Sequence, residues 1–212
     1  MWEKRGLIYK PSGEAGWMNS HAQTPTALLL ADRIRIYIAV RPEQKLTLIT
    51  YVDIDAKDPS RVLYVHKEPI LPLGKVGTFD EFGVMPNMVM PVGNEVWLYT
   101  AGWQRQQNVP VTAIGLAISN DNGATFKKAF EGPIMPPSHH EPYSTMGPYV
   151  ILHDGNWHMW YSTGMEWQKQ GDVYERTYGI FYAQSKDGIR WQRDGICCIP
   201  LKRMMNAVPA HR

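Results

Sequence analysis

An internal repeat limits the folds that this chain can adopt more than any other feature of its sequence. Tyr37, Tyr99 and Tyr161 each stand within a short apolar or aromatic segment, and the two intervals between them are equal. A period of about 60 residues predicts a series of similar structural units that stack on one another. Prolines precede these segments at nearly the same interval: Pro25, Pro86, Pro148 and Pro209.

The pattern within the units indicates β-strands. Apolar residues alternate with other residues over residues 34–40 and again over residues 46–54, and this period of two is typical of a strand. The 18 glycines and 16 prolines interrupt the rest of the chain so often that short strands and turns are favoured over helices.

A second motif recurs within the later units, in which serine, aspartate and glycine are followed by an aromatic residue. Ser119 and Asp121 in the first copy correspond to Ser185 and Asp187 in the second, and the two pairs are separated by the same interval. In such a hairpin turn the aspartate caps its own backbone, the glycine adopts a positive φ and the aromatic ring packs beneath. The motif resembles the Asp-box of sialidase-type propellers, which lies away from the catalytic centre, and the resemblance implies structural roles for both aspartates.

Each unit therefore reads as four antiparallel strands, which is the composition of a β-propeller blade. We expect an all-β fold and a single, partial propeller domain over residues 1–212, with blades at about 18–78, 79–140 and 141–200 and the start of a fourth. A β-sandwich is the alternative, although the fixed spacing of the aromatic strand weighs against it.

The expected blade count has a consequence for the edges of the domain. A propeller needs at least four blades to close its ring, so we expect a truncated chain, or one that self-associates through open blade edges. The stretch beyond about Ile199 reaches the fourth proline without a following aromatic strand, and we expect it to be frayed or extended.

Composition excludes several classes of partner. The 22 Lys and Arg residues and 20 Asp and Glu residues leave a net charge of +2, which does not favour nucleic acid or an anionic membrane. We find no apolar run near the roughly 18 residues of a membrane span and no signal-peptide pattern, so we expect a cytoplasmic protein. Cys197 and Cys198 are adjacent, which argues against a disulfide scaffold or a cysteine zinc site.

Candidate functional residues stand where each blade begins. The first strand of a propeller blade lines the central channel, so carboxylates that start successive blades converge although they are a whole repeat apart in sequence. Asp80, Glu81 and Glu141 occupy such positions. Paired carboxylates on either side of a sugar bond are the machinery of glycoside hydrolysis.

Several segments together resemble the five-bladed β-propeller glycoside hydrolases and their relatives (families 32, 43, 62, 68 and 130), in particular uncharacterised bacterial members linked to surface-polysaccharide genes. The resemblance runs from about residue 2 to residue 191 and implies hydrolysis or transfer of a glycosidic bond, with a carbohydrate ligand and no cofactor. The segments that carry it are residues 20–22, 79–84, 114–119, 159–161 and 182–188.

The family places an Asp in blade one, an Asp in blade two and a Glu in blade three. On that template Asp80 matches the second carboxylate and Glu141 the general acid, whereas Asn19 and His21 stand where the blade-one Asp is expected. Three alternatives follow: Asp80 or Glu81 supplies the base, His21 replaces it, or the protein binds a glycan without cleaving it.

The remaining candidates are substrate-binding residues. Arg41 ends an alternating strand and is suited to hold a hydroxyl or carboxylate, or to form a surface ion pair. Trp103 and Trp167 follow the repeated aromatic strand, where they would either stack on a sugar ring or pack between blades. His140 and Tyr143 flank Glu141 at the start of blade three, and we predict no metal site there because adjacent side chains seldom converge on one ion.

Overall fold

The computed structural model describes residues 4, 6–42, 46–106 and 109–199, and in this part of the chain it contains three four-stranded antiparallel sheets and no helix. The strands pair in chain order within each sheet. This arrangement confirms the all-β prediction.

The first sheet contains β1 (Ser20–Leu29), β2 (Arg33–Arg41), β3 (Leu48–Asp55) and β4 (Val62–Val65). The second contains β5 (Gly83–Val92), β6 (Glu95–Arg105), β7 (Pro110–Ser119) and β8 (Lys127–Lys128). The third contains β9 (Thr145–His153), β10 (Asn156–Gln170), β11 (Val173–Ser185) and β12 (Cys197–Ile199).

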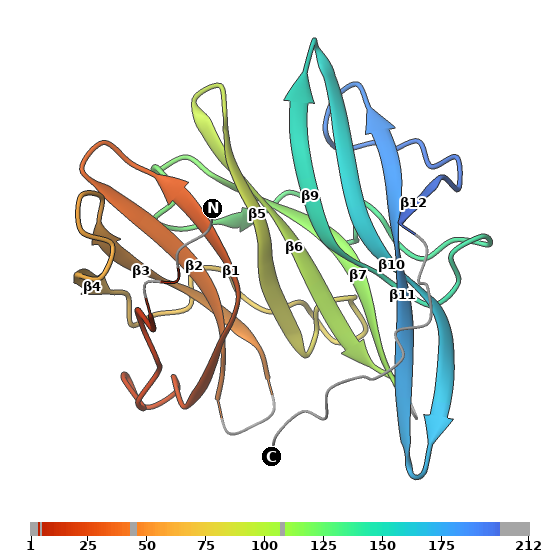
Figure 1. The fold of residues 1–212 in the computed structure, drawn as a ribbon, viewed down its shortest axis with the longest axis horizontal. Helices are drawn as coiled ribbons and strands as arrows, with labels where there is room; N and C mark the ends of the chain where they lie inside the picture. Colours follow the sequence, from red (N-terminus) through yellow and green to blue (C-terminus); the bar gives the residue numbers. More distant parts are fainter. Residues whose placement is uncertain (1–3, 5, 43–45, 107–108, 200–212) are drawn as a thin grey trace.

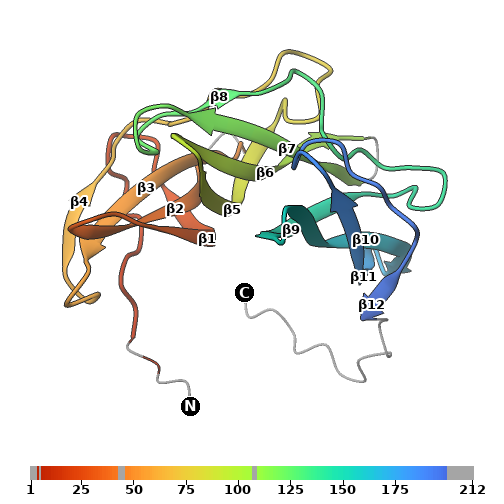
Figure 2. The ribbon, with the colours of Figure 1, turned by 90° about the horizontal axis from the view of Figure 1, so that it is seen from above.

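The three sheets stand side by side in an arc (Figure 1). Seen from above, β1, β5 and β9 lie on the inner side of the arc, and β4, β8 and β12 lie on its outer side (Figure 2). This is the arrangement of propeller blades, in which the first strand of each sheet lies nearest the axis. Among the described residues there is no helix that is long and apolar enough to cross a membrane.

The repeating prolines lie in the inner strands, at or beside irregularities of the ladder. Pro25 falls within a register shift between β1 and β2, and Pro86 borders one between β5 and β6. Pro148 lies opposite a third shift, between β9 and β10. Proline has no N–H to donate to a neighbouring strand, and a β-bulge is one of the places where a sheet tolerates it. Pro209 lies outside the described residues.

The repeating tyrosines lie in the second strand of each sheet, and all three are fully buried. Tyr37 donates a hydrogen bond from Oη to the carbonyl of Gly123, at 2.8 Å, and Tyr99 donates one to the carbonyl of Gly188, at 3.0 Å. Both bonds join one sheet to a turn of the next. The repeated residue therefore fixes neighbouring sheets to one another.

Those two glycines belong to the serine–aspartate–glycine turns, which join β7 to β8 and β11 to β12. In the first turn Ser119 Oγ bonds Asp121 and accepts from the amide of Gly123, while Thr125 donates to Asp121 from its amide and its hydroxyl. Gly123 has a φ of +77°, a left-handed conformation that favours glycine. The second turn repeats this design around Asp187.

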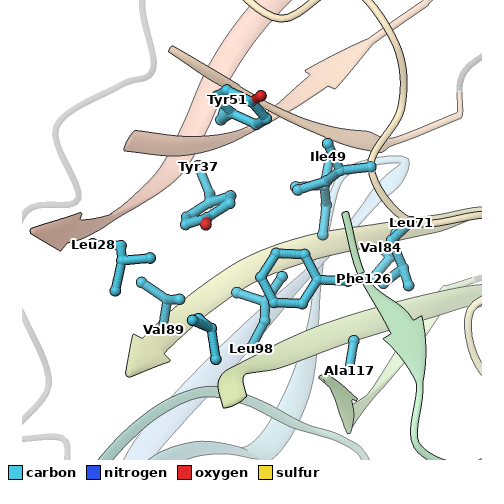
Figure 3. Close-up of a cluster of buried hydrophobic side chains, with 12 residues drawn as sticks. Leu28, Tyr37, Ile49, Tyr51, Leu71, Val84, Val89, Leu98, Ala117 and Phe126 are labelled. Atoms are coloured by element: carbon cyan, nitrogen blue, oxygen red, sulfur yellow. The ribbon is translucent and has the colours of Figure 1, made fainter. Parts of the chain in front are cut away.

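Apolar side chains fill the spaces between adjacent sheets. Figure 3 shows the cluster between the first and second sheets, where Tyr37 and Phe126 meet edge to face with ring centroids 5.5 Å apart. Between the second and third sheets, Trp97 and Trp157 stack with centroids 5.5 Å apart. Burial of this aromatic surface between sheets is the main force that holds the arc together.

The far face of the first sheet is covered by the segment that precedes it. Met18 is fully buried against Ile38 and Val40, and Trp17 packs beside them. At the other end of the arc β12 is exposed and pairs with β11 alone among the described strands. The expectation of a frayed stretch after Ile199 concerns residues 200–212, which lie outside the described residues.

Candidate functional site

A cleft of about 1070 Å³ lies on the side of the molecule where the inner strands β1, β5 and β9 begin. All three sheets contribute to it, because β1, β5 and β9 each start there and the second strands of the first two sheets end there. We call it the three-sheet cleft. Its lining residues are Asn19, Ser20, His21, Gln23, Thr24, Arg41, Pro42, Met85, Trp103, Arg105, Pro110, Thr112, Met146 and Arg176.

The cleft brings together four of the residues that sequence analysis selected for substrate binding. Asn19 and His21 come from the start of the first sheet, Arg41 from the end of β2 and Trp103 from the end of β6. Trp103 also joins the first two sheets, because its Nε1–H donates to Thr47 Oγ1 at 3.1 Å. The indole is thereby held in a fixed orientation at the cleft wall.

The backbone of β1 is strained where it borders the cleft. His21 has a φ of +67° and Thr24 a φ of +49°, which are left-handed backbone values that residues other than glycine seldom adopt. The two residues accompany two register shifts between β1 and β2. Bulges turn side chains away from their regular direction, and such strain is concentrated at functional sites.

The imidazole of His21 is held by a hydrogen bond with its neighbour Ser20. Ser20 Oγ donates to the carbonyl of Arg41 at 3.3 Å and lies 2.9 Å from His21 Nδ1. The hydroxyl of Ser20 therefore holds one nitrogen of the ring and leaves the other, Nε2, without a contact from Ser20. Partial burial, and then the charge of Arg41, lower the pKa of His21 and so favour its neutral form.

Two threonine hydroxyls of the cleft lining are buried without a partner among the described residues. They are Oγ1 of Thr24 and Oγ1 of Thr112, and Thr112 is 4% exposed. Buried polar groups nearly always find a hydrogen-bond partner, and leaving one unsatisfied costs about 1–3 kcal/mol. Both threonines line the cleft, and Thr112 also borders a separate cavity of about 460 Å³. A ligand with hydroxyl groups can supply the missing bonds when these side chains turn toward it.

The structure places Asp80 and Glu81 in the loop before β5, outside the lining of the three-sheet cleft. Asp80 is 1% exposed, forms an ion pair with Lys128 and accepts a hydrogen bond from the hydroxyl of Thr78 at 3.1 Å. Glu81 accepts the amide proton of Gly77 at 2.8 Å. These contacts stabilise the fold of the loop.

Glu141 lies beyond the cleft as well. It is 3% exposed, and Tyr161 Oη donates to its two carboxylate oxygens at 2.9 and 3.0 Å. Arg193 Nη1 is 3.4 Å from Oε2. Burial, and then the hydrogen bond to this carboxylate, raise the pKa of Tyr161. Glu141 borders a separate cavity of about 360 Å³, together with His140.

The other two predicted residues do not line the three-sheet cleft either. Tyr143 is 37% exposed in the loop before β9. Trp167 is not a lining residue, and the guanidinium of Arg176 is centred 4.7 Å from its ring centroid. It therefore orients a residue that does face the cleft.

The sequence did not predict six polar residues of the lining, which are Ser20, Gln23, Thr24, Arg105, Thr112 and Arg176. One signal was available, because Arg41 and Arg105 each end the second strand of a repeat unit. Arg176 lies in a third strand, and its approach to the cleft depends on how the sheets are arranged in space. Over the described ranges, no three His, Cys, Asp or Glu side chains are close enough to hold a metal ion.

Comparison with known proteins relates the chain to two curated proteins of Mycobacterium tuberculosis, from strains CDC 1551 and H37Rv. Both are described as uncharacterized and are 36% identical to it over 194 residues. The match covers 91% of this chain, and the chain spans 64% of the length of these relatives. No family model matches the sequence.

Solved structures similar to this chain include several glycoside hydrolases. One matches with a TM-score of 0.67 and 13% identity, over 90% of this chain and 60% of the other. A family 117 enzyme of Zobellia galactanivorans matches with a TM-score of 0.63 and 17% identity, over 91% and 51%. A thermostable family-43 enzyme matches with a TM-score of 0.62 and 17% identity, over 87% and 57%. The chain therefore shares the propeller-like fold of these hydrolases, as the resemblance predicted; at such identities the likeness shows the fold alone.

Proposed function

We propose that this protein is carbohydrate-active and that the three-sheet cleft binds the saccharide. The observation that carries the proposal is the pair of buried hydroxyls, on Thr24 and Thr112, that lack partners among the described residues of the cleft wall. Saccharides are rich in groups that both donate and accept hydrogen bonds, and the fold that shapes the cleft is one that glycoside hydrolases use.

The rest of the lining suits the same ligand. Asn19 and Gln23 offer amide donors and acceptors, Arg41 offers paired N–H donors, and Trp103 offers an aromatic face for the C–H surface of a sugar ring. These groups come from two neighbouring sheets, so a ligand in the cleft can contact both. A site of this kind binds by few, well-oriented polar contacts on a mostly preformed surface.

Hydrolysis or transfer of a glycosidic bond is the second candidate. The observation in its favour is His21, because a lowered pKa favours the neutral imidazole, which keeps a lone pair on one ring nitrogen and so suits a general base. Asp80 and Glu141 are the family-type carboxylates, and each is buried with a cationic partner away from the described lining. Saccharide binding is therefore the function that this geometry supports best.

Calorimetric titration of the full chain with an oligosaccharide panel tests the proposal. Asparagine tolerates a left-handed backbone, so His21→Asn changes the ring with little added strain. We expect a saccharide to bind the wild type and to bind His21→Asn several-fold more weakly. His153→Asn, at the exposed end of β9, is the matched control and should bind like the wild type.

Turnover of an aryl-glycoside panel separates the two candidates. Glycosidase action would be lost in Glu141→Gln or Asp80→Asn if those carboxylates are catalytic, and in His21→Asn if the imidazole is the base. Binding without turnover would support the glycan-binding function. Absence of binding to every saccharide would refute the proposal.

A further inference from the structure

We infer that the three-sheet cleft selects a saccharide that carries an oxyanionic substituent, such as a carboxylate, sulfate or phosphate group. This inference rests on the proposed function, and it adds the charge of the ligand. The observation behind it is that Arg41, Arg105 and Arg176 all line the cleft, whereas none of its described lining residues is an aspartate or glutamate.

The three arginines come from three different sheets. Arg41 ends β2, Arg105 ends β6 and Arg176 lies near the start of β11. They stand far apart in sequence, one in each repeat unit, so only the arc of sheets brings them to one cleft. Like charges that converge on a concave surface create a positive potential that concentrates anions.

The guanidinium of Arg176 is held in place by uncharged groups. It donates from Nη1 to Ser144 Oγ at 2.5 Å and from Nε to the hydroxyl of Tyr178 at 3.0 Å. It also lies over the rings of Trp167 and Tyr178, at 4.7 and 5.1 Å. These contacts orient the group without neutralising it, so its charge acts on the cleft.

The guanidinium of Arg105 lies 4.4 Å from the ring centroid of Phe82 and 5.7 Å from that of Trp103. Arg41 is exposed at the cleft, and its charge contributes to the lowered pKa of His21. A planar guanidinium binds a carboxylate, sulfate or phosphate with two parallel hydrogen bonds, which is the strong form of this contact. Arginines oriented around one cleft therefore favour a ligand that carries an oxyanion.

The buried Thr112 hydroxyl is a second observation on the cleft wall that favours a ligand with hydrogen-bonding groups. Its Oγ1 has no partner among the described residues, and the side chain is 4% exposed. It lines the same cleft as the arginines. The cleft therefore offers both hydroxyl recognition, as a sugar needs, and charge recognition, as an oxyanion needs.

The test compares oligosaccharides in pairs that differ only in charge, by calorimetric titration of the full chain at low and high salt. Trigalacturonate with its methyl ester is one pair, and sulfated and phosphorylated oligosaccharides with their neutral parents are the others. We expect at least one acidic member to bind about tenfold more tightly than its neutral partner at low salt, and the ratio to fall as salt screens the charges. Inorganic phosphate alone should bind more weakly than that saccharide.

Arginine variants test whether the preference for acidic saccharides comes from these residues. Arg41→Gln should reduce the acidic-to-neutral affinity ratio several-fold, and Arg176→Gln serves as a second variant on another sheet. The matched control is Arg61→Gln, since Arg61 is an exposed arginine that pairs with Asp55 away from the cleft. Circular dichroism checks that each variant keeps its β-sheet fold.

The outcomes separate this inference from the proposed function. If neutral members bind as well as or better than acidic ones, the inference is overturned and saccharide binding stands. If phosphate alone matches the acidic saccharide, the cleft is an oxyanion site without sugar recognition and the inference also fails. If no member of any pair binds, both proposals fail.

Discussion

Asp80 and Lys128 form a buried ion pair that joins the loop before the inner strand of the second sheet to the outermost strand of that sheet. Asp80 is 1% exposed, and its neighbour Thr78 donates a further hydrogen bond. A charge taken out of water in this way depends on its partner, since the carboxylate can recover its lost hydration only from nearby donors.

We therefore expect Lys128→Met to lower the free energy of unfolding by about 3–5 kcal/mol, because it leaves Asp80 buried and unpaired. The double variant Asp80→Asn with Lys128→Met should recover a large part of that loss. Urea denaturation followed by tryptophan fluorescence measures both. Lys127, the exposed neighbour on the same strand, provides the control Lys127→Met; equal effects of the two lysine substitutions would contradict the role assigned to the pair.

The turn at Gly123 gives a second prediction. A Cβ at this position would lie 2.1 Å from the hydroxyl of Tyr37, and the backbone has a positive φ. We expect Gly123→Ala to cost about 3 kcal/mol or more, because strain, clash and the lost inter-sheet hydrogen bond add together. Gly155 has a similar φ of +72°, but a Cβ there would meet no atom within 4 Å, so Gly155→Ala should cost only about 1 kcal/mol. Thermal denaturation of the two variants provides the comparison.

Removal of one inter-sheet hydrogen bond should weaken the fold measurably. Tyr99→Phe keeps the buried ring but leaves the carbonyl of Gly188 without its donor, so we expect a loss of about 1–2 kcal/mol in unfolding free energy. Tyr149→Phe, at a tyrosine that is 58% exposed, should change stability by less than about 0.5 kcal/mol. A loss in Tyr99→Phe no larger than in this control would argue against the bond.

Acid sensitivity should arise in part from the two serine–aspartate–glycine turns. Burial alone would raise the pKa of Asp121, but hydrogen bonds from Ser119 and Thr125 outweigh it and lower the pKa to about 2. The amide of Arg190 is the main cause that lowers the pKa of Asp187. A carboxyl whose pKa is lower in the folded state stabilises the protein above the unfolded pKa of about 3.9 and loses this effect as pH falls toward 2.

We expect the double variant Asp121→Asn with Asp187→Asn to be less stable than the wild type at pH 6 by about 1–2 kcal/mol, a modest figure because solvent screens both groups. The difference should shrink between pH 4 and pH 2, where the wild-type carboxylates become protonated. Urea midpoints measured across this range test the prediction. A difference that stays constant with pH would show that charge is not the cause.

The repeat made it possible to predict the fold from the sequence, because the repeated tyrosines and prolines each have a local structural role. Tyr37 and Tyr99 recur at a fixed spacing because each fills the same place between sheets, and Pro86 recurs because the inner strand has a bulge there. Alternation over residues 34–40 predicted β2, and in the structure Ile38 and Val40 pack against the N-terminal segment while Tyr37 packs toward the second sheet, as the alternating faces of a strand require.

The residues of the site were harder to predict from the sequence than the fold. Asn19, His21, Arg41 and Trp103 were found because they stand at strand ends, which the repeat locates. The pairings of Asp80 with Lys128 and of Glu141 with Tyr161 follow from contacts between elements that are distant in the chain. A motif at the start of a blade does not specify whether its carboxylate faces the axis or a buried partner.

The tyrosine links between sheets also have a consequence for biosynthesis. The hydrogen-bond acceptor of Tyr37 is a carbonyl 86 residues further along the chain, and that of Tyr99 is one 89 residues further along. A ribosome releases the first sheet well before Gly123 is available, so the aromatic face around Tyr37 stays unpaired during that interval. Folding that depends on such distant contacts is slow, and chaperone binding to this nascent face is the expected protection against aggregation.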